Sequence, residues 1–376
     1  MSRRAVLKAA AGAAALGFIP PLQTDFEGCD DGSDYDSGGR VDIDDDETIS
    51  YNALYNNPPL LGRVEYVQAV LEEPAAWDRV VRRIFYGDVV PIYGTLRAEP
   101  PSALPHNDVW FELDDGFVHS SFVVPVTEHF HRPEPVIGNG FWGEITVTTS
   151  WQHRKPTLSS KRYYDLAWGA VYQVIDRVDE ACGRSWYRIV DDANPHHPWW
   201  VQAHHVRRMR SPEFAPISPA VPPEHKRIEV IIDEQLLTCY EYGQPVFSTR
   251  IASGATFWDS EGNPLSFHTP YGEHYVQRKT PSRHMSGGED INDFFDLPGV
   301  PWCTFLSFKG AAIHGTYWHN DYGRPRSHGC VNVTPDAAKW IYRWVYPVVG
   351  YEDIYYWTGA EERETATIID IKRTRA

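Results

Sequence analysis

Short runs in which β-branched or aromatic residues alternate with polar ones recur along most of the chain. Between residues 60 and 210 these runs are separated by Gly, Asp and Pro, which predicts short antiparallel strands joined by tight turns. The pattern returns further on, with strands expected at 227–233, 236–242 and 246–253 and a hairpin turn at Tyr242-Gly243-Gln244. A last strand is expected at 366–371.

One helix stands out among these strands. Thr334 suits an N-cap, Pro335 suits the first helical position, and Asp336 lies where the helix dipole favours an acid. Apolar residues follow at helical spacing, at positions 337, 338, 341 and 344. The chain is therefore predicted to be mainly β, with one or two short helices.

Residues 60–210 contain a weak internal repeat of three blocks. Residues 61–64, 86–90 and 109–113 match residues 142–145, 168–172 and 185–189 in the same order. Each copy closes with an aromatic-valine strand, at 117–123 and 199–206. Each copy resembles a bacterial SH3-like module, a small β barrel often attached to cell-wall enzymes.

The segments outside these modules differ in composition. Residues 1–24 carry Arg3-Arg4 before an Ala-rich apolar run too short to cross a bilayer, which resembles a twin-arginine export signal. Residues 25–50 form an acidic, Gly/Ser-containing tether, and residues 211–225, with five prolines among 211–223, indicate a stiff linker. The expected domains are the signal 1–24, the tether 25–50, modules 51–135 and 136–210, the linker 211–225 and a C-terminal domain 226–376.

Composition excludes two broad classes. The chain has 51 acidic and 35 basic side chains, a formal charge of −16, which argues against nucleic acid as a partner. Hydrophobic residues make up 42% and aromatic residues 14%, enough to build cores, so global disorder is excluded. The cysteines, at 29, 182, 239, 303 and 330, are five in number, so an exported chain would keep at least one free thiol.

The densest polar cluster lies between residues 313 and 332. A reactive thiol needs a base to form the thiolate and backbone N–H donors for the oxyanion that follows attack on a carbonyl. His314 ends a β-type run and could approach Cys330 across the intervening loop. Gly329 permits close approach of an acyl group, and Cys330 lies just before the helix, whose dipole favours an anionic sulfur.

This cluster resembles the signature of YkuD-type L,D-transpeptidases, a histidine followed after a spacer by Ser/Thr-His-Gly-Cys-x-Asn. All six signature positions are filled, by His314, Ser327, His328, Gly329, Cys330 and Asn332. Thr269-Pro270-Tyr271-Gly272 is also similar to the T-P-x-G turn of that family. The resemblance covers roughly residues 226–371 and implies a β-sandwich-like catalytic domain after the two SH3-like barrels.

The resemblance implies a role for each matched position. Cys330 would be the nucleophile, His314 its base, and the carbonyl of Gly315 would orient that imidazole. His328 would be a supporting histidine, while backbone N–H groups around Gly329 and Cys330 would hold the oxyanion. Ser327 and Asn332 would shape the loop. The substrate groove would be lined by Met285, Tyr317 and Trp318.

The implied activity is peptidoglycan cross-linking outside the cytoplasm. Cys330 would form a thioester with a tetrapeptide stem, release D-Ala and pass the acyl group to an amine of a neighbouring stem, giving a 3→3 cross-link. No metal or cofactor is required, and carbapenems are expected to inactivate the enzyme through the same cysteine. The protein is expected in the cell envelope, exported by the twin-arginine route, with the signal either cleaved or kept as a membrane anchor.

Three other functions compete with this one. Papain-like wall peptidases place Cys before His, whereas no histidine follows Cys330. An L,D-carboxypeptidase would share the acyl-enzyme and use water as acceptor, so the sequence leaves that alternative open. A non-enzymatic wall-binding protein conflicts with the intact motif. The histidine pairs 196–197 and 204–205 are interpreted as solvated loop residues rather than a metal cluster.

Overall fold

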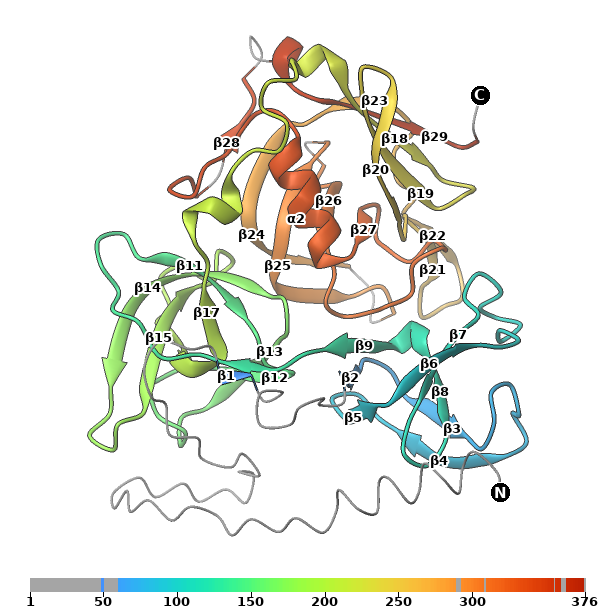
Figure 1. Cartoon of the computed structure of the whole chain (residues 1–376), viewed down its shortest axis with the longest axis horizontal. Helices are drawn as coiled ribbons and strands as arrows, with labels where there is room; N and C mark the ends of the chain where they lie inside the picture. Colours follow the sequence, from blue (N-terminus) through green and yellow to red (C-terminus); the bar gives the residue numbers. More distant parts are fainter. Residues whose placement is uncertain are drawn as a thin grey trace.

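The structure is a computed structural model that describes residues 49–50, 60–288, 292–307, 309–354, 356–359 and 363–374. The predicted signal 1–24, most of the tether and Cys29 lie outside the described residues. As predicted, the protein is mainly β. Figure 1 shows two small β units, drawn in blue to cyan and in green, below a larger C-terminal part drawn in yellow to red.

The first unit consists of two small sheets within residues 60–126. A three-stranded sheet has the order β5-β2-β9, and a five-stranded sheet has the order β4-β3-β8-β7-β6. The strands are β2 (Leu60–Val64), β3 (Gln68–Leu71), β4 (Val80–Ile84), β5 (Val89–Ile92), β6 (Gly94–Arg97), β7 (Val109–Glu112), β8 (Phe117–His119) and β9 (Val123–Val126). A separate pair, β1 (Ile49–Ser50) with β10 (His129–Phe130), shows that the end of the predicted tether is a strand.

The second unit is one seven-stranded sheet in the order β13-β12-β16-β15-β14-β11-β17. Its strands are β11 (Phe141–Ile145), β12 (Thr149–His153), β13 (Arg162–Ala167), β14 (Val171–Asp179), β15 (Ser185–Val190), β16 (Trp199–Gln202) and β17 (Val206–Arg208). Strand β11 pairs with β14 and β17 as β2 pairs with β5 and β9, and a short 3₁₀ turn precedes both β9 and β17. This shared pairing supports the predicted repeat, whereas the likeness to SH3-like modules stays a prediction.

Two five-stranded sheets, a hairpin and a helix make up the C-terminal part. One sheet has the order β20-β19-β18-β29-β23 and the other β27-β26-β25-β24-β28. The bounds are β18 (Lys226–Ile231), β19 (Leu236–Glu241), β20 (Gln244–Arg250), β21 (Thr256–Trp258), β22 (Pro264–Ser266), β23 (Gly272–Tyr275), β24 (Arg278–Gly287), β25 (Phe295–Phe305), β26 (Ala312–Gly315), β27 (Val331–Val333), β28 (Tyr356–Trp357), β29 (Ile368–Lys372) and α2 (Pro335–Trp344).

The helix begins and caps as predicted. Thr334 is the N-cap, and its hydroxyl accepts a hydrogen bond from the Ala337 backbone N–H. The buried face of α2, with Ala338 and Ile341, packs against Ile313 and Val331 on one face of the second sheet. Because α2 covers one face of that sheet, other segments of the chain must surround its opposite face.

The hydrophobic core of the C-terminal part extends into the second unit. Trp142 and Val171 belong to the same buried cluster as Ile313, and Phe214 of the predicted linker packs against Trp302 with ring centroids 5.0 Å apart. The Pro-rich segment is thus packed into the molecule rather than a free spacer. No helix within the described ranges is long and apolar enough to cross a membrane.

Candidate active site

Two neighbouring parallel strands bring Cys330 and His314 together. Strands β26 and β27 pair with Ile313 opposite Val331 and His314 opposite Asn332, so Cys330 lies at the start of the strand beside the histidine. Residues opposite one another in a ladder share a face, which places both side chains on the face away from α2. The 15 residues between them contain the connecting loop that was expected from the sequence.

The tautomer of His314 follows from its hydrogen bond. Its ring is 2% exposed, and Nδ1 lies 3.0 Å from the carbonyl oxygen of Gly315. A carbonyl only accepts, so Nδ1 carries the proton and donates it, which leaves Nε2 as the acceptor of a neutral ring. Burial lowers the pKa of His314 to about 4, opposed by the Gly315 bond.

Gly315 itself has little room for a side chain. An added Cβ would lie 2.9 Å from Pro335 Cα and 2.9 Å from a carbon of the Pro301 ring. The glycine therefore lets β26 pass close to the start of α2 while its carbonyl holds the imidazole.

The Cys330 thiol is half-buried and protonated in the resting protein. Burial raises its pKa to about 11, opposed by a hydrogen bond with the Ala312 backbone. The sulfur also lies 3.9 Å from the carbonyl of Gly310. The pair is thus a neutral thiol beside a neutral imidazole, an arrangement suited to proton transfer as the sulfur attacks.

Hydrogen bonds within the loop shape the approach to Cys330. The Ser327 hydroxyl donates to the Cys330 carbonyl at 2.6 Å and accepts from the Gly329 N–H at 3.2 Å. Gly329 has a φ of 105°, which favours glycine. Because the Gly329 N–H already has this partner, the Cys330 N–H is the freer of the two expected oxyanion donors. Asn332 lies 3.1 Å from His319 through its amide nitrogen.

The side chain of His328 packs among aromatic rings and is not a direct partner of His314. Its ring stacks on Phe257 at 4.1 Å between centroids and also contacts Phe267 and Phe295. Burial lowers the pKa of His328, and its Nε2 is buried with no hydrogen-bond partner. His328 is therefore a neutral ring in an aromatic cage that packs the residue before Gly329.

A cavity of about 1660 Å³ opens over this face of the sheet. Among the sequence candidates, it is lined by Met285, His314, Tyr317, Trp318, Ser327, His328, Gly329, Cys330 and Asn332, whereas Gly315 is not among the described lining residues. Trp318 lies 5.8 Å from His314 between ring centroids, and the Tyr317 hydroxyl donates to the Pro298 carbonyl at 2.6 Å. The three expected groove residues thus surround the same space as Cys330.

The N-terminal units give this cavity a wall that was not predicted from the sequence. Arg63 and Glu65 are buried and paired at 2.5 Å, Arg63 also pairs with Asp165 of the second unit, and the Tyr86 hydroxyl donates to Asp165 at 2.6 Å. All four residues line the cavity. The sequence signal that could have indicated this wall is the pair of charged residues Arg63 and Glu65 in an otherwise apolar stretch.

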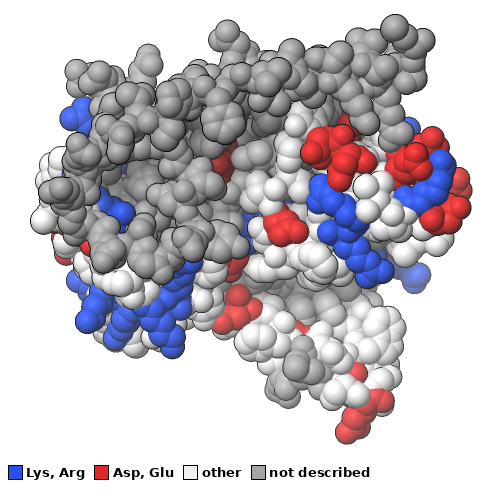
Figure 2. All heavy atoms as spheres, turned by 90° about the horizontal axis from the view of Figure 1, so that it is seen from below, with Lys and Arg blue, Asp and Glu red and all other residues white. Residues whose placement is uncertain are grey.

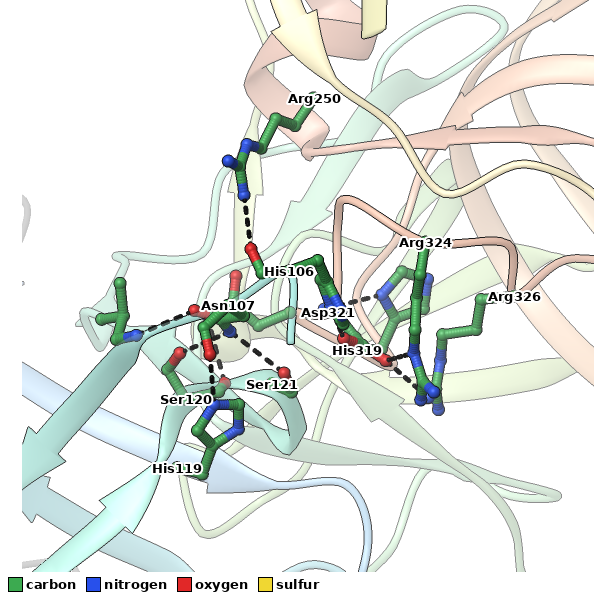
Figure 3. A network of polar contacts seen from close by, with 12 residues as sticks. His106, Asn107, His119, Ser120, Ser121, Arg250, His319, Asp321, Arg324 and Arg326 are labelled. Atoms are coloured by element: carbon green, nitrogen blue, oxygen red, sulfur yellow. Dashed lines mark hydrogen bonds and ion pairs between the residues drawn. The ribbon is translucent and has the colours of Figure 1, made fainter. Parts of the chain in front are cut away.

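A second missed feature attaches the first unit to the loop between His314 and Cys330. The buried carboxylate of Asp321 accepts from Arg324 at 2.6 Å and Arg326 at 3.1 Å and contacts His106 at 2.7 Å (Figure 3). Burial raises the pKa of Asp321, but the two arginines outweigh it and hold the pKa below its usual value. The Arg250 guanidinium adds a bond to the His106 carbonyl. The first unit therefore fixes the loop that precedes the cysteine.

A third missed feature is a charged histidine at the cavity wall. His284 Nδ1 lies 2.7 Å from Asp191 and Nε2 lies 2.5 Å from Asp296. Burial lowers the pKa of His284, but the two carboxylates outweigh it and raise it to about 9. The Tyr164 hydroxyl donates to the other oxygen of Asp296 at 2.6 Å. This cluster joins the second unit to strands β24 and β25.

Charge is unevenly distributed over the protein. On the face drawn in Figure 2, basic side chains gather at the lower left of the described surface, and acidic ones lie mainly on the right. Among the described residues that line the cavity, cations outnumber carboxylates: Arg63, Arg278, Arg283, Lys309, Arg324 and Arg326 against Glu65, Asp165 and Asp296. The chain's formal charge of −16 therefore does not describe the candidate site.

The four histidines set aside as metal ligands lie in two settings. His196 and His197 are exposed, whereas His204 stacks on the Phe130 ring at 5.7 Å between centroids and the ring of His205 lies 2.8 Å from the Ser150 hydroxyl. The solvated-loop interpretation is thus wrong for His205. In the part of the chain that the structure describes, no group of three or more His, Cys, Asp or Glu residues could hold a metal ion.

Several solved structures are similar to part of the chain. An Enterococcus faecium L,D-transpeptidase mutant shares 22% identity over 39% of this chain and 50% of its own, with a TM-score of 0.29. A Mycobacterium smegmatis L,D-transpeptidase shares 15% identity over 54% and 99%, with a TM-score of 0.29. A Mycobacterium tuberculosis L,D-transpeptidase 3 with a faropenem-derived adduct shares 17% over 39% and 60%, with a TM-score of 0.28.

The chain thus spans about half the length of the Enterococcus faecium protein it matches. A comparison with curated protein sequences finds no match. The family comparison is more specific, because it covers the segment that carries His314, Cys330 and the strands around them. Residues 225–361 match the YkuD family, the L,D-transpeptidase catalytic domain.

Proposed function

We propose that this protein is an exported peptidoglycan L,D-transpeptidase with Cys330 as its nucleophile. The observation that carries the proposal is the pairing of β26 with β27, which sets the neutral imidazole of His314 beside the thiol at the mouth of one large cavity. The family match of residues 225–361 supports the same activity.

The reaction would proceed in two halves. As Cys330 Sγ attacks the carbonyl of the L-centred third residue of a tetrapeptide stem, His314 Nε2 accepts the thiol proton. The Cys330 N–H donates to the oxyanion, the C–N bond to D-Ala breaks, and the proton passes from His314 to the departing amine. The product of this half is a thioester on Cys330 and free D-Ala.

The second half transfers the acyl group. An amine of a neighbouring stem attacks the thioester, His314 takes the amine proton, and the thiolate leaves and regains a proton from the histidine. The result is a 3→3 cross-link and the starting enzyme. No step needs a metal ion or cofactor.

Water as the acceptor would make the same acyl-enzyme an L,D-carboxypeptidase. The wide cavity, with walls from both N-terminal units, favours a second peptide strand as the acceptor. The twin-arginine-like start of the chain supports export to the cell envelope, where peptidoglycan stems and carbapenems would reach Cys330.

Incubation of the purified protein with disaccharide tetrapeptides, followed by mass spectrometry, tests the proposal. We expect a cross-linked dimer with loss of one D-Ala, and no product with Cys330→Ala. Tripeptide without dimer would identify the carboxypeptidase. Absence of both products, or equal yield from Cys330→Ala, would contradict the proposal.

A further inference from the structure

Arg278 is a cation without a partner in a cavity where the neighbouring arginines are paired. Arg63 pairs with Glu65, Arg283 with Asp192, and both Arg324 and Arg326 with Asp321. Within the described ranges, the guanidinium of Arg278 has neither an ion pair nor a hydrogen bond, and its Nε is buried and unsatisfied. Its terminal nitrogens are thus left for a group that enters the cavity it lines.

Two aromatic rings hold this guanidinium in place. Its central carbon lies 3.8 Å from the centroid of the Phe305 ring and 4.8 Å from that of Trp357. Such stacking fixes a cation but leaves the edges of its planar group free to donate. Burial and then the like charge of Arg283 lower the pKa of Arg278, although an arginine stays charged at neutral pH. An anion would offset that cost of burial.

The sheet register aligns Arg278 with the nucleophile. Arg278 is opposite Phe305, Phe305 is opposite Ala312, and Ala312 lies beside Cys330 by the register of β26 with β27. Opposite residues share a face, so all four side chains lie on the cavity side, and Arg278, Phe305 and Cys330 all line the cavity.

The register also sets the distance between the two groups. Three strand spacings separate the backbones of Arg278 and Cys330 by roughly 14 Å. Because the guanidinium reaches over Phe305 on the next strand, it lies about two spacings, roughly 10 Å, from the thiol. The hydrogen bond to a carboxylate takes up about 3 Å of this distance, and the approach of the sulfur to the attacked carbonyl takes up about 3 Å more. The roughly 4 Å that remain correspond to one or two residues, since an extended chain spans about 3.5 Å per residue.

We propose that Arg278 binds a carboxylate of the stem peptide and so positions the scissile carbonyl at Cys330. This inference rests on the proposed function. A guanidinium donates two parallel hydrogen bonds to a carboxylate, which fixes the orientation of the bound chain as well as its place. Two stem carboxylates lie within reach, that of the departing D-Ala and the free one of the D-glutamate that precedes the attacked residue.

Three synthetic donors test the proposal on the unaltered protein. They are the free tetrapeptide stem, the stem with D-Ala as its carboxamide, and the stem with the D-glutamate carboxylate as its carboxamide. Release of D-Ala or its amide gives kcat/KM for each. We expect one of the two amides to react about 10- to 100-fold more slowly, mainly through KM, as for loss of a charged hydrogen bond. The slower amide identifies the carboxylate bound.

Variants then assign the effect to Arg278. In Arg278→Gln the free stem should slow by a similar factor and the discrimination between acid and amide should vanish, while Arg278→Lys should retain part of it. Lys309→Gln is the matched control, because Lys309 is an exposed cation at the same cavity, and it should keep the full discrimination. Labelling of Cys330 by iodoacetamide, which carries no carboxylate, should be equal in all four proteins.

Equal turnover of the three donors by the unaltered protein would overturn the proposal without any variant. Full discrimination retained by Arg278→Gln, or lost equally in Lys309→Gln, would overturn it as well. If the unaltered protein released D-Ala from none of the donors, the proposed function itself would be wrong, which is a distinct outcome.

Discussion

Two buried histidines face the same cavity from strands of one sheet, yet their protonation is opposite. His314 on β26 is 2% exposed and His284 on β24 is 6% exposed. The pKa of His314 lies near 4, whereas that of His284 lies near 9. Burial lowers both pKa values, so the difference comes from their partners, a carbonyl for His314 and two carboxylates for His284.

This contrast separates a proton acceptor from a structural cation. The neutral ring of His314 has a free Nε2 and suits the base of the proposed reaction. The charged ring of His284 bridges Asp191 of the second unit and Asp296 of β25, so it stabilises the packing of the two parts. Substitution of His314 should therefore affect catalysis and largely spare stability, and substitution of His284 should do the reverse.

The largest effect is expected from His314→Gln. Loss of a positioned base should lower kcat for D-Ala release by about 10²- to 10⁴-fold. The free energy of unfolding should change far less, because glutamine keeps an N–H that can donate to the Gly315 carbonyl. Steady-state kinetics with a tetrapeptide, beside urea unfolding, measures both. Near-normal kcat in a folded His314→Gln protein would remove the histidine from the mechanism.

Substitution of His284 should have the reverse outcome. His284→Gln leaves two carboxylates near each other without their cation, and breaking a buried ion pair costs about 3–5 kcal/mol of stability. Urea unfolding should show this loss, whereas kcat per folded molecule should change less than in His314→Gln. An unchanged unfolding midpoint would show that the cluster does not hold the two parts together.

The stability of the protein should depend on pH in opposite directions through His284 and through His314. The folded pKa of His284, near 9, is above its ordinary value of 6.5, so its stabilisation is complete below pH 6.5 and is lost as pH rises to about 9. The loss is up to about 3 kcal/mol. For His314 the folded pKa is depressed, so its contribution is lost as pH falls from 6.5 to about 4. Unfolding of His284→Gln should lack the alkaline change, and an identical pH profile would contradict the assignment.

The smallest effect is expected in the pH–rate profile. The thiol pKa near 11 and the imidazole pKa near 4 keep the pair neutral across the physiological range. We therefore expect kcat/KM for D-Ala release to change less than about threefold between roughly pH 6 and 8.5. A steep rise with a midpoint near 6.5 would show that His314 titrates at its ordinary value and is not buried in the free enzyme.

Local signals predicted much of the C-terminal part. Thr334 and Pro335 begin the helix because capping depends on neighbouring residues alone. The hairpin turn at 242–243 has positive φ at both residues, which matches a two-residue turn. The motif residues His314 and Cys330 were found from their spacing, and the structure brings them onto adjacent strands.

The missed residues depend on contacts between distant segments. Asp191 is 93 residues from His284, and His106 is 215 residues from Asp321. No local pattern indicates that such pairs meet. The free guanidinium of Arg278 is distinctive only because folding pairs the neighbouring arginines with acids, some of them from distant segments. The sequence therefore pointed to the candidate cysteine and histidine, which the structure brings onto adjacent strands, whereas the walls of the cavity depend on the packing of three parts of the chain.

Rapid-quench mass spectrometry, of the intact protein and then of its peptides, tests the central claim most directly. The protein is mixed with a tetrapeptide stem, quenched within the first turnover and digested to locate any adduct. We expect a mass gain equal to the stem minus D-Ala, on the peptide that contains Cys330, and a much slower gain in His314→Gln. Product formation with no adduct on Cys330, or with an adduct on another residue, would contradict the assignment of Cys330 and His314.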